Sequence, residues 1–359
     1  MEGEGIDVKA QHKDKTMKHI YVLHEYGAPT HYLALQELAD KNGYKVGYYE
    51  LWKWNFIIKH PNQWKKYIVN RFFWAIVPFL PTSKIVLGIA PYNKRLPRIM
   101  RKLRKHEVYY HTSYTCWDGT RFAHAPKSDH AIDDWKGFTK HYVKHIFAVS
   151  EKCKSELVKN GFTSDENVST VNHSYNYDVE PEANKGKSDS FIYVGRLIEE
   201  KGIKELLDFF ASHPELKFTI VGAGPLEEEV KQYATQYGNI HYEGYISGFK
   251  HIAPHYQKHS FFVLNSKKNA TWEELFGMTI IESMACGCVP ICTNHSGPQE
   301  IITNGANGFL TEEGTIGDAI RNAAHISAEE YQELRGKAIQ RGKEFQSQNI
   351  ASKWAAILD

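Results

Sequence analysis

The stretch ELFGMTIIE, residues 274–282, places two carboxylates, Glu274 and Glu282, eight residues apart. From Met278 to Gly287 the apolar residues recur at the spacing of one helical face, which predicts a helix that contains Glu282 and begins after Glu274. The first N–H groups of a helix have no partner within it and carry partial positive charge, so they suit a phosphate. Carboxylates beside such an anion site can accept hydrogen bonds from sugar hydroxyls. Taken alone, two glutamates around a helix start are most often only solvated charges.

Three glycine-containing stretches accompany this segment: VGRL at 194–197 followed by Lys201-Gly202, VGAGP at 221–225, and SGPQEII at 296–302. In chain order, the four stretches resemble motifs of retaining GT-B glycosyltransferases of the large family 4 group, which use nucleotide-sugar donors. Residues 274–282 are similar to the Glu-x7-Glu motif of that group, and VGRL resembles its diphosphate-binding signature. The resemblance is strong from Phe191 onward and covers the first half only in outline.

The resemblance implies an α/β fold of the GT-B type, in which two Rossmann-like, doubly wound domains face a central cleft. The alternation of strand and helix patterns agrees and predicts six strands in each half. The expected organisation is a flexible leader (1–16), an N-terminal acceptor domain (17–178), a linker (179–190), a C-terminal nucleotide-sugar donor domain (191–340) and a C-terminal helix that crosses back to the first domain (341–359), with a bend near Gly342.

The resemblance assigns the donor site mainly to the C-terminal half. Arg196 and Lys201 would stabilise the departing diphosphate, because a guanidinium fork and an ammonium group suit charged oxygens. Glu274 would bind the hydroxyls of the transferred sugar, and Glu282 the ribose. The other expected donor contacts are the backbone amides of Phe276, Gly277 and Met278, the glycines Gly27 and Gly222, and, near the base, Tyr245 and Ile246.

His111 follows the predicted strand Glu107–Tyr110 and resembles in position the N-domain histidine of the family, which lies close to the transferred sugar. His111 and Glu274 are therefore the expected catalytic residues, although a lone histidine is more often structural. The resemblance implies no protein general base, because in the family the departing phosphate is proposed to deprotonate the acceptor hydroxyl.

The loop Thr115–Lys136 is the candidate acceptor site, because long irregular loops are often functional and tryptophan stacks well on sugar rings. Its candidate contacts are Trp117, Asp118 and Trp135. The loop contains Asp133-Asp134 but no D-x-D arrangement typical of metal-dependent transferases, so we expect neither a catalytic metal nor a cofactor. The nucleotide-sugar is a substrate, and UDP-sugars are favoured over GDP-sugars.

Composition is that of a globular protein, with 42% hydrophobic and 24% charged residues. The five cysteines form no C-x-x-C pair, which favours a reducing compartment over disulfides or a zinc site. Neither an apolar signal region nor a run of about 18 apolar residues occurs. These observations predict a cytoplasmic protein, peripheral on the inner membrane face if it binds a membrane.

Between Leu51 and Tyr110 the sequence holds thirteen Lys or Arg residues and one acid, Glu107, and four of the eight tryptophans fall within Leu51–Leu80. Aromatic residues among cations suit an anionic membrane surface, which residues 51–105 would contact. Helices that pack these aromatic residues into the core, with solvated lysines, are an equal alternative. A nucleic-acid partner is not expected, because no recognition motif accompanies the basic residues.

The sequence thus predicts a metal-independent retaining glycosyltransferase that moves a hexosyl unit from a nucleotide-diphosphate sugar to a lipid-linked or glycan acceptor, in the synthesis of a cell-surface polysaccharide or glycolipid. Two alternatives stay open: a transferase with a soluble small-molecule or protein acceptor, and a catalytically silent scaffold of the same fold. Base, sugar, linkage and oligomeric state are not specified by these motifs.

Overall fold

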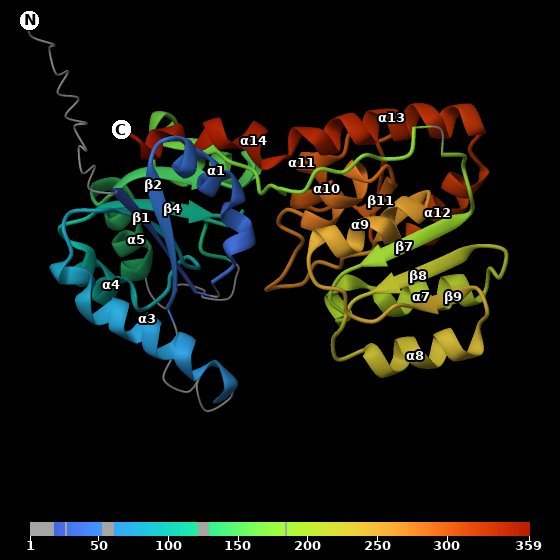
Figure 1. The fold of residues 1–359 in the computed structure, drawn as a ribbon, viewed down its shortest axis with the longest axis horizontal. Helices are drawn as coiled ribbons and strands as arrows, with labels where there is room; N and C mark the ends of the chain where they lie inside the picture. Colours follow the sequence, from blue (N-terminus) through green and yellow to red (C-terminus); the bar gives the residue numbers. More distant parts are fainter. Residues whose placement is uncertain (1–17, 26, 52–60, 121–128, 184) are drawn as a thin grey trace, which may run out of the picture.

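The computed structural model describes residues 18–359 except 26, 52–60, 121–128 and 184. The described chain forms two parallel six-stranded sheets that lie side by side, each covered by helices (Figure 1). The strand order is β2-β1-β3-β4-β5-β6 in the first sheet and β12-β11-β10-β7-β8-β9 in the second. The two predicted doubly wound domains and their twelve strands are therefore confirmed.

The middle strands of the first domain, Lys84–Gly88 and Glu107–Thr112, are buried at all but their first residue, typical of a parallel sheet that is covered on both faces. The last strand of this domain, β6, ends at Thr170. The elements are β1 (Lys18–His24), η1 (Pro29–Tyr32), α1 (Leu33–Lys41), β2 (Tyr44–Glu50), η2 (Pro61–Gln63), α3 (Trp64–Ile76), η3 (Val77–Phe79), β3 (Lys84–Gly88), α4 (Leu96–Leu103), β4 (Glu107–Thr112), α5 (Asp129–His141), β5 (Val143–Ala148), α6 (Glu151–Lys159), η4 (Asp165–Asn167) and β6 (Val168–Thr170).

The second domain follows the same plan, and all four residues of its central strand β10 are buried. Its elements are β7 (Ser190–Val194), η5 (Glu199–Lys201), α7 (Ile203–Ala211), β8 (Lys217–Val221), α8 (Glu227–Gln236), β9 (Ile240–Tyr242), α9 (Phe249–Lys258), β10 (Phe261–Leu264), α10 (Met278–Ala285), β11 (Val289–Thr293), α11 (Ser296–Ile301), β12 (Phe309–Thr311), α12 (Ile316–His325) and α13 (Ala328–Glu344).

The chain crosses between the domains twice, and the two crossings are hydrogen-bonded to each other. The amide of Tyr175 donates to the carbonyl of Phe345 at 3.1 Å, and the amide of Ser347 donates to the carbonyl of Tyr175 at 2.8 Å. Beyond them, α14 (Ser347–Ile350) and η6 (Ala351–Ile357) pack on the first domain, where Trp354 is buried against Phe147. The segment after α13 therefore packs on the first domain.

Gly342 does not form the predicted bend. Helix α13 continues through it to Glu344, and a Cβ at Gly342 would lie 2.5 Å from the amide nitrogen of Ala285. The glycine instead allows α13 to pack closely on α10. Among the described residues no helix is long and apolar enough to span a membrane.

Candidate active site

Two adjoining cavities lie between the domains, where the ends of β7 and β8 meet the start of α10. The first has a volume of about 560 Å³ and the second about 400 Å³. Both are lined by Val194, Gly195, Arg196 and Met278. Every donor-site residue predicted in the C-terminal half lines at least one cavity: Gly222, Tyr245, Ile246 and Glu282 the first, Lys201, Glu274, Phe276 and Gly277 the second, and Arg196 and Met278 both.

Glu274 and Lys201 form an ion pair in the second cavity, and their side chains are only 13% and 12% exposed. The hydroxyl of Ser266 also donates to the Glu274 carboxylate, at 3.2 Å. On its other side, the Lys201 ammonium lies 5.3 Å from the ring centre of Trp272. A cation and a carboxylate therefore stand together in a part of the cavity that is large enough for a sugar phosphate.

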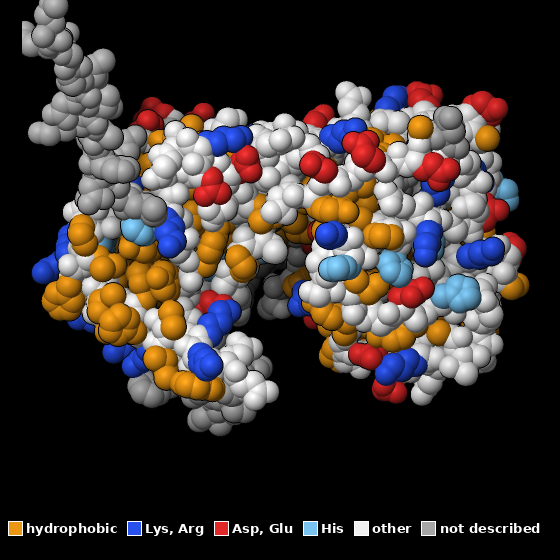
Figure 2. Space-filling model, in the orientation of Figure 1, with side chains coloured by type: hydrophobic (Ala, Val, Ile, Leu, Met, Phe, Trp, Pro, Cys, Tyr) orange, Lys and Arg blue, Asp and Glu red, His pale blue; other side chains and the backbone are white. Residues whose placement is uncertain are grey.

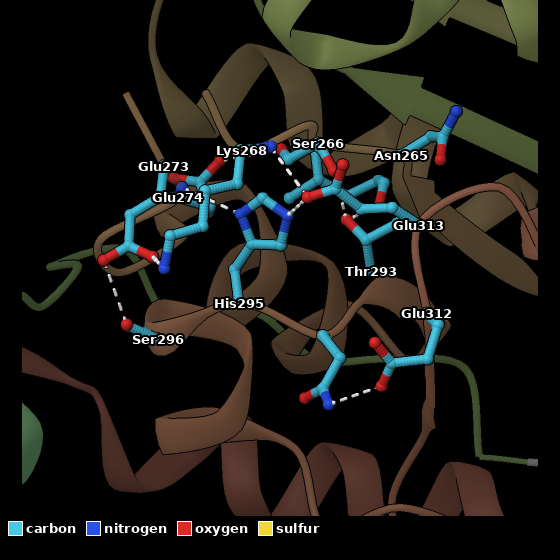
Figure 3. Close-up of polar contacts among 12 residues, drawn as sticks. Asn265, Ser266, Lys268, Glu273, Glu274, Thr293, His295, Ser296, Glu312 and Glu313 are labelled. Atoms are coloured by element: carbon cyan, nitrogen blue, oxygen red, sulfur yellow. Dashed lines mark hydrogen bonds and ion pairs between the residues drawn. The ribbon is translucent and has the colours of Figure 1, made fainter. Parts of the chain in front are cut away.

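The ring of His295 is hydrogen-bonded to the backbone of Glu274 (Figure 3). Its Nδ1 accepts the Glu274 N–H at 3.2 Å, so the ring proton is on Nε2, which donates to Glu313 at 2.9 Å. The carbonyl of Glu274 accepts a bond from the amide of Gly297 at 2.9 Å. Both backbone groups of Glu274 are thus fixed by residues that follow β11.

Glu273 joins the two domains at the edge of the second cavity. Its carboxylate accepts a bond from the hydroxyl of Thr115 in the first domain, at 2.7 Å, and one from Ser296, at 3.1 Å, and it pairs with Lys268 at 2.6 Å. Burial works to raise the pKa of Glu273, but these partners together hold it below the ordinary value. The carboxylate therefore stays charged while it ties the loop after β4 to the second domain.

Glu282 lies on α10 and lines the first cavity. Burial raises the pKa of its carboxyl to about 8, and no charged partner among the described residues opposes that effect. A group of this kind can accept two hydrogen bonds from a vicinal diol, which would favour the ionised form. The geometry suits a ribose between Glu282 and the ends of the strands.

The start of α10 faces both cavities. Gly277 precedes the helix with φ 105°, a conformation that favours glycine, and the first amides of the helix have no acceptor within it. Arg196 is exposed at the junction of the cavities and forms no ion pair with another described residue. Together they form an electropositive junction suited to a diphosphate.

Gly222 lies at the end of β8, where the chain passes very close to the end of β7. A Cβ at this position would lie 1.9 Å from the carbonyl oxygen of Gly195, so only glycine fits. Tyr245 is 72% exposed at the mouth of the first cavity, beside Ile246. An exposed aromatic ring there is available to stack on a base.

On the N-terminal side the structure corrects two expectations. His111 lies at the end of β4 but is buried, with Nδ1 3.2 Å from the Tyr32 hydroxyl, and it is not among the described residues that line the cavities. Burial, with His31 and His24 nearby, keeps the pKa of His111 well below its ordinary value. Gly27 lines neither cavity: a Cβ there would meet the Glu50 carboxylate at 2.1 Å.

His31 and His173 occupy the position expected for His111. Their rings stack with centres 4.1 Å apart, and both line the second cavity. His173 also contacts the ring of Phe276 across the domain boundary, with centres 5.2 Å apart. Thr30 and Leu33 close the first cavity from the same side.

The predicted acceptor tryptophans belong to the core. Trp117 and Trp135 are 1% and 2% exposed and pack with Phe162 and Tyr110 in the first domain, so in this conformation they cannot stack on a sugar. The second part of the expected loop is helix α5, which starts at Asp129 and buries Trp135. Residues 121–128 of that loop lie outside the described part of the chain.

Asp118 is exposed and turned toward its own loop. Its carboxylate accepts bonds from the thiol of Cys116 and from the hydroxyl and amide of Thr120, which lower its pKa to about 2. The described residues contain no group of three His, Cys, Asp or Glu side chains placed to hold a metal ion.

Several cavity residues had no motif to mark them in the sequence: His31, Ser113, His173, Tyr175, Trp272 and Glu273, with His295 behind them. Most follow a predicted strand directly or adjoin residues 274–282. Because ligands of open α/β sheets bind at the carboxyl ends of the strands, these positions were detectable as a group, though not singly.

The two doubly wound domains and the cleft between them define the GT-B architecture. Over 95% of its length the chain superposes on 99% of Anabaena HepE in complex with UDP and glucose, with a TM-score of 0.67 and 16% sequence identity. At that identity the likeness establishes the fold alone.

Residues 177–345 match the family model of glycosyl transferases group 1. The chain is 29% identical over 218 residues to an uncharacterized glycosyltransferase of Methanocaldococcus jannaschii, and this alignment covers 57% of each protein. It is 23% identical over 222 residues to the phosphatidylinositol N-acetylglucosaminyltransferase gpi3 subunit of Schizosaccharomyces pombe, covering 57% of this chain and 46% of that one. The chain thus spans about half the length of the curated relatives it matches.

Proposed function

We propose that this protein is a retaining glycosyltransferase that moves a hexosyl unit from a nucleotide-diphosphate sugar, a UDP-sugar rather than a GDP-sugar, without a catalytic metal. The observation that carries the proposal is the pair of cavities joined at Arg196 and Met278, with Glu282 in one and the Lys201–Glu274 pair in the other. The match of residues 177–345 to glycosyl transferases group 1 supports it.

In the proposed reaction the bond between the anomeric carbon and the phosphate oxygen breaks, and its electron pair moves to the diphosphate. Arg196, Lys201 and the first amides of α10 stabilise that growing charge. The acceptor hydroxyl attacks from the same face and gives its proton to the departing phosphate oxygen. Glu274, fixed by His295, holds the hydroxyls of the transferred sugar. Neither His31 nor His173 is assigned a proton-transfer step.

The proposed acceptor is a lipid-linked molecule or glycan, reached at an anionic membrane surface by a cytoplasmic, peripheral protein. The likeness to a phosphatidylinositol N-acetylglucosaminyltransferase subunit supports a lipid-borne acceptor. The basic residues within 51–105 support the membrane contact, although 52–60 lie outside the described residues. The product would enter a cell-surface polysaccharide or glycolipid.

The test is a donor screen with purified protein, in which release of UDP, GDP or dTDP from each nucleotide-sugar is followed with and without EDTA. We expect slow hydrolysis of one UDP-sugar that EDTA leaves unchanged, and an NMR spectrum that shows the donor's anomeric configuration in the transferred product. Turnover that stops in EDTA, or a product of inverted configuration, would contradict the proposal. Absence of both binding and turnover with all donors would favour a silent scaffold.

A further inference from the structure

Helix α3 carries apolar residues on two opposite faces. The inward face places Phe73 in the core of the first domain, where it stacks on Tyr49, and Val77 at the start of η3 is buried in the same core. The outward face presents Trp64, Ile68 and Phe72, which are 52%, 54% and 65% exposed. These three lie four residues apart, so they form one stripe along the helix. Core packing therefore does not account for the exposed apolar residues of α3.

The exposed apolar surface is concentrated in this segment. Among the described residues, seven large hydrophobic side chains are exposed, and five of them belong to α3 and η3: Trp64, Ile68, Val69, Phe72 and Phe79. Phe79 is 82% exposed, which continues the stripe beyond the helix. Figure 2 shows hydrophobic side chains at the surface along α3 with Lys and Arg beside them. Contiguous exposed apolar patches mark interaction sites.

The segment that carries the stripe is basic, and the neighbouring acid Glu50 is largely buried and paired with Lys66 of α3. Residues 61–106 include no Asp or Glu, and their Lys and Arg residues are Lys65, Lys66, Arg71, Lys84, Lys94, Arg95, Arg98, Arg101, Lys102, Arg104 and Lys105. Helix α4 adjoins α3: the Lys102 ammonium donates to the carbonyl of Trp74 at 2.9 Å. Arg98, Arg101, Arg104 and Lys105 are exposed on or just after α4.

This charge distinguishes between possible partners of the stripe. A second copy of the chain, docked stripe to stripe, would bring two cationic surfaces together at a cost. An anionic bilayer offers opposite charge to the cations and hydrocarbon to the stripe, and tryptophan and phenylalanine suit the boundary between the two. An acidic bilayer therefore satisfies both features at once.

We propose that α3 and η3 lie in the plane of an anionic lipid bilayer, with Trp64, Ile68, Phe72 and Phe79 inserted among the acyl chains and α4 over the headgroups. The inference deepens the proposed function by naming the element that brings the cleft to a lipid-borne acceptor. In Figure 1, α3 runs along the edge of the first domain that lies away from the two chain crossings. Membrane docking there leaves the second domain free to close.

The test is flotation of the full chain with vesicles of equimolar phosphatidylcholine and phosphatidylglycerol, and with pure phosphatidylcholine. We expect the wild type to float with the anionic vesicles only, and less in high salt. Ile68→Asp with Phe72→Asp should lower the partition coefficient about tenfold or more, because charge replaces inserted apolar surface. Arg101→Glu with Lys105→Glu should lower binding to anionic vesicles. The matched control is Tyr142→Asp, which alters an aromatic side chain that is 58% exposed in the same domain.

Wild-type protein that stays at the bottom with anionic vesicles would overturn the inference, as would equal flotation of the Ile68→Asp, Phe72→Asp double variant. A dimer in sedimentation that dissociates in that variant would assign the stripe to a second copy instead. Donor hydrolysis without vesicles separates this inference from the proposed function: hydrolysis without flotation removes the membrane face alone, and flotation without hydrolysis removes the transferase alone. The altered residues are exposed, and circular dichroism checks that each variant is folded.

Discussion

The Lys201 ammonium and the Glu274 carboxylate neutralise each other in the second cavity, where both side chains are largely buried. A partly buried pair of this kind costs desolvation energy, which its mutual attraction only partly returns. A donor diphosphate would offer Lys201 a second anion and would release Glu274 to accept bonds from sugar hydroxyls. The pair therefore keeps both groups in place before the donor arrives.

Replacing Lys201 tests this relationship. Lys201→Met should lower kcat/KM about a hundredfold or more, because it removes a cation from the departing diphosphate and leaves Glu274 unpaired. The measurement is steady-state donor hydrolysis. Lys267→Met is the matched control: Lys267 pairs with Glu205 in the same domain, and both side chains are more than 40% exposed. Similar losses in the two variants would mean that the effect of Lys201 is not specific to the cleft.

The raised pKa of Glu282 predicts a pH-dependent affinity. Because its pKa is about 8, the Glu282 carboxyl is largely protonated at pH 7. A ribose diol donates to the ionised form, so UDP affinity should rise as the pH rises toward about 8, with a proton released on binding. Titration calorimetry in buffers of different ionisation enthalpy measures both effects.

Glu282→Gln should abolish this pH dependence of UDP affinity.

The raised pKa of Glu282 also makes stability depend on pH. Burial favours the neutral carboxyl, so the contribution of Glu282 to the free energy of unfolding is fully favourable below pH 4.5 and is lost as the pH rises toward about 8. Urea unfolding should therefore show Glu282→Gln gaining stability relative to wild type across that window. A constant difference between the two proteins would contradict the assignment of the shift to Glu282.

His295 is a positioning residue, and its replacement should separate turnover from nucleotide binding. His295→Leu removes the acceptor of the Glu274 amide and the donor to Glu313, so kcat should fall about tenfold or more while UDP affinity changes little. His295→Gln, whose amide oxygen can accept from Glu274, should recover part of the loss.

The control for His295 is another buried histidine of the same domain. His259 is also hydrogen-bonded through both ring nitrogens, to the His255 carbonyl and to Thr219. His259→Leu should cost about 1–3 kcal/mol of stability without a fall in kcat of the remaining folded enzyme. If His295→Leu weakens UDP binding and turnover equally, His295 supports the fold in general rather than Glu274.

The close approach at Gly222 predicts a large effect from one methyl group. Gly222→Ala would push the chain away from the Gly195 carbonyl, so UDP affinity should fall about tenfold and the melting temperature should drop. Gly238→Ala is the comparison, because a Cβ there meets no atom within 4 Å. That change should be neutral or stabilise by about 0.4–1 kcal/mol. Unaltered UDP binding in Gly222→Ala would show that the cavity tolerates the shift.

The donor half of the cleft was largely predictable because its residues are tied to local signals. The spacing of apolar residues after Met278 predicted α10, and it placed Glu282 on that helix. Gly195 and Gly222 each directly follow a predicted strand. Because parallel strands end at the same edge of a sheet, the two glycines are expected to lie close together. The role of His295 depends on two loops that meet only in the folded protein, which no local pattern reports.

The acceptor half was less predictable because an aromatic residue suits a core as well as a sugar. A long loop and the residue type indicate Trp117 and Trp135 as acceptor contacts, but both side chains are buried. A helical signal was present, since Ile132, Trp135 and Phe138 recur every three residues on α5. Helix α3 shows the same ambiguity with the opposite outcome. Its composition is compatible with either a membrane-facing surface or a buried core, and only the folded structure shows which of its apolar residues are exposed.

The position of Trp354 has a consequence for the order of synthesis. This side chain fills the layer between α1 and the first sheet, beside Tyr32 and Phe147, more than 300 residues after β1. On a ribosome the first domain emerges early, yet its packing stays incomplete until the segment after α13 has been translated. In a nascent chain that lacks this segment, the apolar surface that Trp354 covers would be exposed. Chaperones should therefore bind the first domain for longer than the second.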